Sequence, residues 1–414
     1  LDGFRGWFIG SILETEGAIK SRFTRHKSLV EKDMWITKIG FTDEREDNLR
    51  FQPGSDTLSS AAYKFYDWQF YVANLDSSDF GYKVFYRERT DFEENFDDYS
   101  ESTHAIHYGA ELSLLGNPKN TLKATVSNRI LEIVDEESTD QEPEETLLMR
   151  LEYGGRFFKN TITTNTFYEI GSGLERRQEF IYLLDPTGQG PFTWIDYNEN
   201  GIKELNEFER ARPEDGERYL RVFTPTDEYE RAYSNQFSQS LNISPAGIWM
   251  KEEGVKKVLA RFSNQTAFRI QRKTRQEDEV DRFNPFADAT GTENLISQSS
   301  SIRNTFFYNR TSSKFGVDYT YSDQTSKTPL TSGFEEREST AHIMRLRYNF
   351  TSKYGAILEQ ETGNRKSGSD FLEGRNYSID YISLKPTFSY QPSTAFRANL
   401  SGTYTLKENA SALG

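Results

Sequence analysis

Apolar and polar residues alternate with a period of two along most of this chain, and this limits what it can fold into. In the segment 396–406, one parity is apolar or small and the other is polar, with Phe396, Ala398, Leu400, Gly402, Tyr404 and Leu406 against Arg397, Asn399, Ser401, Thr403 and Thr405. Such alternation indicates a β-strand with two unlike faces. Segments of roughly nine to fourteen residues with aromatics near their ends are typical of strands that cross a bilayer in a closed barrel.

The composition fits a barrel better than a soluble globular core. Hydrophobic residues make up 35% of the 414 residues, and aromatic residues alone make up 14%. So few aliphatic residues would barely fill a globular core, whereas a barrel with a wet lumen needs only one apolar face on each strand. Low hydrophobicity is also typical of disordered chains, but the aromatic content and the regular alternation argue against disorder.

Charge and cysteine content exclude several classes of partner and site. The formal net charge of −14 argues against a nucleic-acid partner, because the phosphate backbone is itself anionic. Without cysteine, the chain has no disulfide, thiolate metal site or thiol nucleophile. The sequence also lacks a run of about 18 apolar residues, so no transmembrane helix is expected.

The pattern predicts about 14–16 antiparallel strands. They fall in two blocks of barrel strands, 1–170 and 231–414, separated by an inserted segment at 171–230 that contains several prolines and glycines. Long and short connections roughly alternate, with long loops expected at 91–101, 135–146, 271–297 and 323–340 and short turns at 116–120 and 159–160. Short turns on one side and long loops on the other are typical of bacterial outer-membrane barrels.

The segment from Val258 to Ile270 shows the alternation very clearly, so it gives a test of orientation. We expect its apolar parity to face lipid and its polar parity to face the lumen. The outward set is Val258, Ala260, Phe262, Phe268 and Ile270, and the inward set is Arg261, Gln265 and Arg269.

The inserted segment contains a calcium-loop motif. Residues 196–208 read DYNENGIKELNEF and fit the pattern D-x-[DN]-x-[DN]-G-x5-E. Calcium takes about six to eight oxygen ligands, and this spacing delivers them from one short loop. The predicted ligands are the side chains of Asp196, Asn198 and Asn200, the carbonyl of Ile202, Glu204 directly or through water, and Glu207 as a bidentate carboxylate.

One position departs from the usual calcium loop. Lys203 stands where an aliphatic residue is common, and no amphipathic helix clearly precedes the loop. We therefore expect a structural calcium ion of modest affinity, in the roughly micromolar-to-millimolar range. The alternative is an ordinary acidic Asn-Gly turn without an ion.

No motif points to catalysis. The histidines are His26, His104, His107 and His342. Because His104 and His107 lie three residues apart, a strand would place them on opposite faces. The sequence has no HExxH, GxSxG or phosphate-loop motif, so we expect no enzymatic activity.

A resemblance to known proteins covers the stretch from Glu169 to Thr226. This stretch includes EIGSGLERRQEFIYLLDPTGQGPFTWIDYNENGIKELNEFE and YLRVFTPT, and it resembles a segment of large, mostly uncharacterised outer-membrane β-barrel proteins of Bacteroidota-type bacteria. Outside this stretch the likeness is one of strand composition. The resemblance implies a large envelope barrel and an outer-membrane location, and it implies neither a reaction nor a substrate.

The sequence therefore predicts an all-β fold, an antiparallel transmembrane β-barrel with an inserted calcium-loop segment. The bare start at Leu1 and the end ENASALG suggest a piece of a larger barrel. We expect a non-enzymatic channel, translocon or scaffold component of the bacterial outer membrane, with the lipid bilayer and other envelope proteins as partners. The alternative is a secreted or cell-surface β-protein for adhesion or filament assembly, which would need no continuous apolar girdle of about 25 Å.

Overall fold

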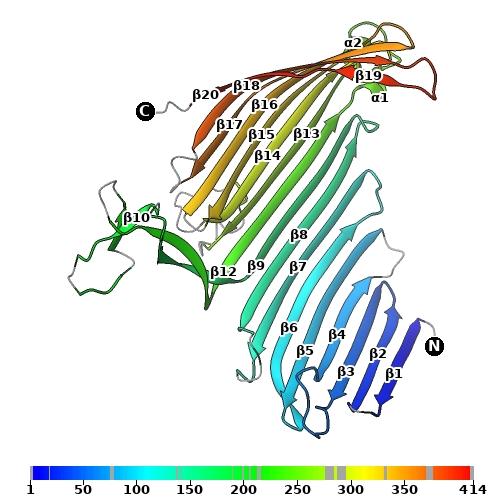
Figure 1. The fold of residues 1–414 in the computed structure, drawn as a ribbon. Helices are drawn as coiled ribbons and strands as arrows, with labels where there is room; N and C mark the ends of the chain where they lie inside the picture. Colours follow the sequence, from blue (N-terminus) through cyan, green and yellow to red (C-terminus); the bar gives the residue numbers. More distant parts are fainter. Residues whose placement is uncertain are drawn as a thin grey trace. The chain divides into compact units, whose positions relative to one another are not determined.

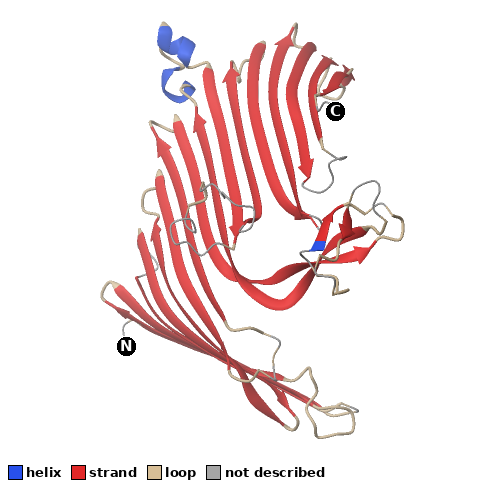
Figure 2. Ribbon diagram, turned by 90° about the vertical axis from the view of Figure 1, so that its left-hand side faces the viewer, coloured by secondary structure: helices blue, strands red, loops and turns tan. Residues whose placement is uncertain are grey.

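The computed structural model confirms an all-β antiparallel fold with almost no helix (Figure 2). It describes residues 3–410 except 18, 75–78, 137–138, 140, 189, 198–199, 205–206, 212–215, 276–283, 287–294, 331–332 and 370–375. The described residues form 20 strands and two short helices, so the predicted 14–16 strands were too few. They divide into two compact units, unit 1 (Leu1–Gly154 and Phe167–Leu174) and unit 2 (Gly155–Thr166 and Glu175–Gly414).

Unit 1 is a ladder of long strands in which each strand pairs with the next (Figure 1). Its strands are β1 Phe4–Thr15, β2 Ser21–Met34, β3 Thr37–Arg50, β4 Tyr63–Asn74, β5 Phe80–Asn95, β6 Asp98–Leu114 and β7 Asn120–Ile133. Two further strands, β8 Glu144–Phe157 and β9 Ile162–Leu184, contribute residues to both units. Within the described residues the residue-by-residue pairing of β1 is with β2, and a closed barrel is not shown.

Unit 2 contains the second ladder and a small hairpin. The hairpin strands are β10 Phe192–Trp194 and β11 Phe208–Arg210. The long strands are β12 Tyr219–Ile243, β13 Phe262–Thr274, β14 Leu295–Tyr308, β15 Phe315–Leu330, β16 Gly333–Asn349, β17 Tyr354–Ser369 and β18 Tyr377–Tyr390, followed by β19 Ala398–Ser401 and β20 Tyr404–Asn409. Each strand from β12 to β18 pairs antiparallel with the next.

Two connections predicted as long loops are hydrogen-bonded hairpins. In place of the loop 91–101, β5 and β6 continue to a tight turn at Phe96 and Asp97. In place of the loop 323–340, β15 and β16 stay paired as far as Leu330 opposite Gly333. Strand pairing satisfies the backbone whatever the side chains are, and a strand with water on both sides needs no apolar face. Polar composition therefore did not distinguish a projecting hairpin from a loop.

Two short helices, α1 Ala246–Trp249 and α2 Val255–Leu259, join β12 to β13. The strand predicted to start at Val258 therefore starts at Phe262, and the strand orientation assigned to Val258, Ala260 and Arg261 was wrong. Val255, Val258 and Leu259 lie at i, i+3 and i+4, which suits a helix as well as a strand. No helix in the described part of the chain is long and apolar enough to span a membrane.

From Phe262 onward the predicted separation of the two parities in β13 is confirmed, and the assignment of one face to lipid and the other to the lumen stays a prediction. Strand alternation puts Phe262, Phe268 and Ile270 on one face and Gln265 and Arg269 on the other.

The segment 396–406 holds two short strands, β19 from Ala398 and β20 from Tyr404, with an interruption between them. Both β19 and β20 pair with β18, and the break falls at Gly402. The amide of Gly402 donates to the carbonyl of Pro386 at 3.2 Å, but Pro386 has no N–H to return. The missing donor explains why the ladder stops and restarts there.

The strands reach into the segment predicted as an insertion, since β9 continues to Leu184 and β12 begins at Tyr219. The division into 1–170, 171–230 and 231–414 stays a prediction. The β10–β11 hairpin has an aromatic core, with the Tyr182 and Phe208 rings stacked at 3.9 Å between centroids. Phe192 and Tyr219 pack edge-on against this stack and are buried.

Candidate functional site

In unit 2, rows of cross-strand neighbours are alternately apolar and polar. Residues directly opposite each other in antiparallel strands share a face. One row consists of Phe306, Tyr319, Met344, Gln360, Leu384 and Tyr404. The adjacent row, on the opposite face, consists of Thr305, Thr320, Ile343, Glu361, Ser383 and Thr405. The first row's apolar side chains are 40% to 64% exposed, so the described residues leave this face largely open.

Unit 1 repeats the arrangement. One row consists of Val30, Phe41, Phe70, Tyr86, Tyr108 and Asn128, and its apolar members are 37% to 44% exposed. The adjacent row consists of Thr42, Gln69, Arg87, His107 and Arg129. In each unit we call the face with the first row the apolar face and the opposite one the polar face.

The polar face of unit 2 carries charges of both signs. Asp318 lies opposite Arg345, which lies opposite Glu359 on the next strand. A hollow of about 710 Å³ covers this region, and its lining also includes Arg303, Thr305 and Gln265. Opposite charges on directly opposed residues attract each other, so this face carries charges of both signs that balance locally.

The polar face of unit 1 carries a tighter ion-pair cluster. Arg87 donates from Nε to Asp67 Oδ1 at 2.8 Å, and its Nη2 donates to Asp67 Oδ2. Arg89 donates from Nε to Asp91 at 2.9 Å, and its Nη1 lies 3.9 Å from Asp67 Oδ2. Asp67 is only 8% exposed. Its charge therefore depends on the two arginines more than on water.

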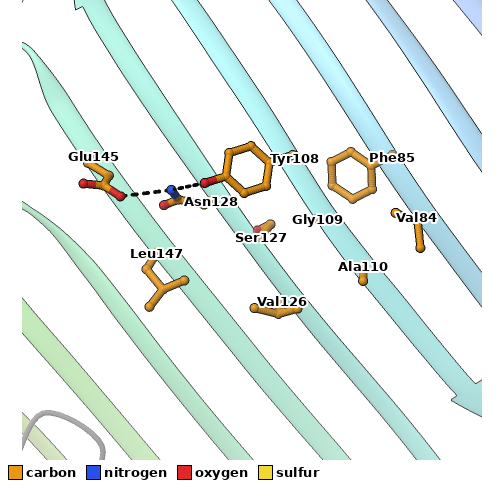
Figure 3. A pocket seen from close by; sticks show the side chains of 10 residues that line it. All are labelled: Val84, Phe85, Tyr108, Gly109, Ala110, Val126, Ser127, Asn128, Glu145 and Leu147. Carbon is orange, nitrogen blue, oxygen red and sulfur yellow. Dashed lines mark hydrogen bonds between the residues drawn. The ribbon is translucent and has the colours of Figure 1, made fainter. Parts of the chain in front are cut away.

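The apolar face of unit 1 has a hollow of about 470 Å³, lined by Val84, Phe85, Tyr108, Gly109, Ala110, Val126, Ser127, Asn128, Glu145 and Leu147 (Figure 3). Small residues among larger ones leave this space. At its margin, Asn128 Nδ2 donates to Tyr108 Oη and to Glu145 Oε1, both at 3.0 Å. Asn128 Nδ2 thus links the two neighbouring polar side chains, whereas Asn128 Oδ1 is buried and has no hydrogen-bond donor among the described residues.

The histidines of β6 are separated as the sequence predicts. His104 Nε2 lies at hydrogen-bonding distance, 2.9 Å, from Glu88 Oε1. His107 belongs to the polar face, opposite Arg87 and Arg129. Within the described residues, no three His, Asp or Glu side chains gather closely enough to hold a metal ion.

The predicted calcium ligands lie in the loop that joins β10 to β11. The carboxylate of Asp196 accepts hydrogen bonds from the amides of Asn200 at 3.1 Å and Gly201 at 2.8 Å. Gly201 has a φ of +71°, a conformation that favours glycine. Asn200 Oδ1 accepts from the amide of Ile202 at 2.6 Å, and Asn200 Nδ2 lies 3.4 Å from Glu204 Oε1. Asn198 lies outside the described residues.

Glu207 stands apart from the other predicted ligands because it is only 1% exposed. Its Oε2 accepts from the Trp194 indole at 2.8 Å and from the amide of Glu204 at 3.3 Å. Its Oε1 is buried and has no hydrogen-bond donor among the described residues. The sequence motif predicted neither this burial nor the contact with Trp194.

Lys203, the departure from the usual motif, packs against the aromatic core of the hairpin. Its ammonium donates to Tyr219 Oη at 2.7 Å and lies 3.7 Å from Glu217. It also lies 5.4 Å from the centre of the Trp194 ring. The hydrogen bond to the Tyr219 hydroxyl, aided by the charge of Glu217, raises the pKa of Lys203. Lys203 thus places a cation beside aromatic rings, at a position where calcium loops commonly have an aliphatic residue.

No protein-family model and no curated protein matches the chain. Among solved structures it is similar to the copper transporter OprC, with a TM-score of 0.36, 11% identity, and coverage of 98% of this chain and 61% of that chain. It is also similar to the ferric-catecholate import receptor Fiu from E. coli K12, with a TM-score of 0.34, 9% identity, and coverage of 98% of this chain and 65% of that chain. A third similar structure is Pseudomonas aeruginosa OccK8, with a TM-score of 0.28, 10% identity, and coverage of 98% of this chain and 92% of that chain.

The chain spans less than two thirds of the length of OprC and Fiu.

Proposed function

We propose that this chain forms the membrane-spanning wall of a bacterial outer-membrane β-barrel that acts as a non-enzymatic channel for hydrophilic solutes. The apolar face would contact lipid, and the polar face would line a water-filled passage. The supporting observation is the row of exposed Phe306, Tyr319, Met344 and Leu384 directly beside a polar row on the other face. In water the exposed row would be costly, whereas in a bilayer it is favourable.

The height of the apolar face agrees with a bilayer. In β18 its residues are Tyr390, Phe388, Pro386, Leu384 and Ile382, and the next position on this face is Asp380. Eight steps of about 3.3 Å span roughly 26 Å along the strand. The lipid-facing band of an outer-membrane barrel is about 25 Å tall, and strand tilt shortens the span somewhat. The aromatic Tyr390 would then lie at one interface.

A channel is favoured over a scaffold or translocon by the polar face. Charged side chains such as Asp318, Arg345 and Glu359 lie side by side on this face, and water in a passage would solvate them at little cost. A barrel that only anchored other proteins could fill its interior with packed side chains instead.

The alternative is a secreted or cell-surface adhesion or filament protein. Such a protein would have to cover the exposed apolar side chains of both units with further copies or partners. In the membrane assignment the lipid bilayer alone covers these side chains, so we favour the membrane assignment.

Site-directed spin labels test the proposal, and the absence of native cysteine makes labelling specific. We expect a label at Leu384→Cys to be more accessible to oxygen, which concentrates in lipid. A label at Ser383→Cys should be more accessible to a water-soluble nickel complex. Phe70→Cys and Gln69→Cys provide the same comparison in unit 1. Equal nickel accessibility at both members of each pair in lipid vesicles would refute the membrane assignment.

A further inference from the structure

We propose that Asp196, Asn200, Ile202 and Glu204, in the described part of the loop between β10 and β11, form a calcium site anchored by the buried carboxylate of Glu207. This site would be additional to the channel function, because none of its residues belongs to the apolar or polar rows of the long strands. Calcium would complete the loop between β10 and β11 and fix the small hairpin to the ends of β9 and β12.

Glu207 has a buried carboxylate oxygen without a partner among the described residues. Such an oxygen is unfavourable, because it has lost its contact with water and gained no hydrogen bond in exchange. Glu207 Oε2 has two donors, whereas Oε1 has none among the described residues. Within the described part of the chain, no lysine, arginine or histidine pairs with Glu207. A cation at Oε1 would supply the missing partner.

The carboxylate of Glu207 lies close to the backbone of the loop. Because Oε2 accepts the amide of Glu204, the carboxyl group lies against the backbone of the loop. Ile195 also donates its amide to the carbonyl of Glu207 at 2.9 Å, which closes the base of the loop. Glu207 thus occupies the last position of the motif and lies beside its first residues.

Other residues of the loop carry further oxygen atoms. Asp196 already closes the turn through the amides of Asn200 and Gly201, and each of its oxygens has further lone pairs for an ion. Asn200 and Glu204 add side-chain oxygens, and Ile202 adds a carbonyl. All of these are hard oxygen ligands, which favour calcium over zinc or copper. The acidic side chains are not yet gathered around a common centre, so binding would draw Asp196 and Glu204 toward Glu207.

The nearby cation does not compete for the site. Lys203 is directed to Tyr219 and Glu217, and not to the carboxylates of Asp196 or Glu207 in any described contact. Its position over the hairpin's aromatic rings explains why a lysine is compatible with a cation loop.

Terbium luminescence gives a direct test, since Tb³⁺ takes calcium's oxygen ligands and is sensitised by a nearby indole. The Trp194 indole donates to Glu207, so we expect Tb³⁺ bound to the full chain in detergent to luminesce on tryptophan excitation. Ca²⁺ should displace Tb³⁺, and Mg²⁺ should do so far less well. Trp194→Phe should abolish the luminescence while leaving Ca²⁺ binding measurable by calorimetry.

Glu207→Gln is the deciding variant, and we expect it to weaken Ca²⁺ binding by about tenfold or more, because one ligand charge is lost. Glu209→Gln is the matched control, since Glu209 lies on β11 beside the site and its carboxylate accepts from Tyr197 Oη. It should bind Ca²⁺ like the unaltered chain. Equal Ca²⁺ affinity in the Glu207→Gln and Glu209→Gln variants would overturn the proposal, as would equal displacement of Tb³⁺ by Mg²⁺.

Limited proteolysis gives a readout that needs no probe ion. With Ca²⁺ bound, we expect cleavage between β9 and β12 to slow, and EDTA should restore it. Glu207→Gln should be cleaved at the EDTA rate under both conditions, while the long strands stay resistant because their pairing does not involve this loop. Cleavage that is independent of Ca²⁺ in the unaltered chain would indicate an ordinary acidic turn.

Discussion

Replacing Met344 with arginine is expected to reduce the stability of the protein in lipid vesicles by about 2–4 kcal/mol, the cost of a cationic side chain near the middle of a bilayer. Met344 is 44% exposed on the apolar face and lies in the row of Phe306, Tyr319 and Leu384. The measurement is the midpoint and slope of denaturant unfolding from vesicles.

The adjacent residue provides the matched control. Ile343 lies on the polar face, opposite Thr320 and Glu361. Ile343→Arg should change stability by less than about 1 kcal/mol, because water and a carboxylate are available to the new charge. If both arginine variants unfold alike, the two faces have the same environment and the membrane assignment is wrong.

Removal of Asp67 should produce the second large effect. Asp67→Ala leaves Arg87 without the carboxylate that takes two of its hydrogen bonds, and Arg89 loses a second ion pair. We expect a loss of about 1–3 kcal/mol, since the carboxylate is buried but the arginine side chains are partly solvated. Denaturant unfolding in the same vesicles measures the change.

Asp56→Ala is the control for Asp67→Ala. Its pairing with Lys20 at 3.8 Å is solvent-exposed on both sides, and exposed ion pairs contribute roughly 0–1 kcal/mol. A loss at Asp67 no greater than at Asp56 would show that water, and not the two arginines, balances the Asp67 charge.

The faces of the sheet could be predicted from the sequence because strand geometry converts a two-residue period directly into a face. Phe268 and Arg269 illustrate this, since they were assigned to opposite faces and lie there. The same reasoning failed at Val258, where three apolar residues satisfied a helical period equally well. A short apolar pattern does not distinguish a helix from a strand unless the neighbouring turn is known.

Other features could not be predicted because they depend on contacts distant in sequence. The stack of Tyr182 on Phe208 joins the end of β9 to β11, and no local pattern connects these residues. The ligand spacing of the 196–207 motif could be predicted from the sequence. The burial of Glu207 could not, because it arises from the fold of the hairpin around Trp194. The hairpin extensions were missed because charged residues are compatible with both loops and paired strands.

The unbroken register between β15 and β16 limits how the length of this chain can vary. Sixteen consecutive pairs run from Phe315 opposite Tyr348 to Leu330 opposite Gly333 without a bulge. Deleting one residue within β16 would move every later side chain of that strand to the opposite face, and put Arg345 where Met344 now lies. Deleting two residues would restore the faces. Related chains should therefore differ in length at the turns, or by even numbers of residues within strands.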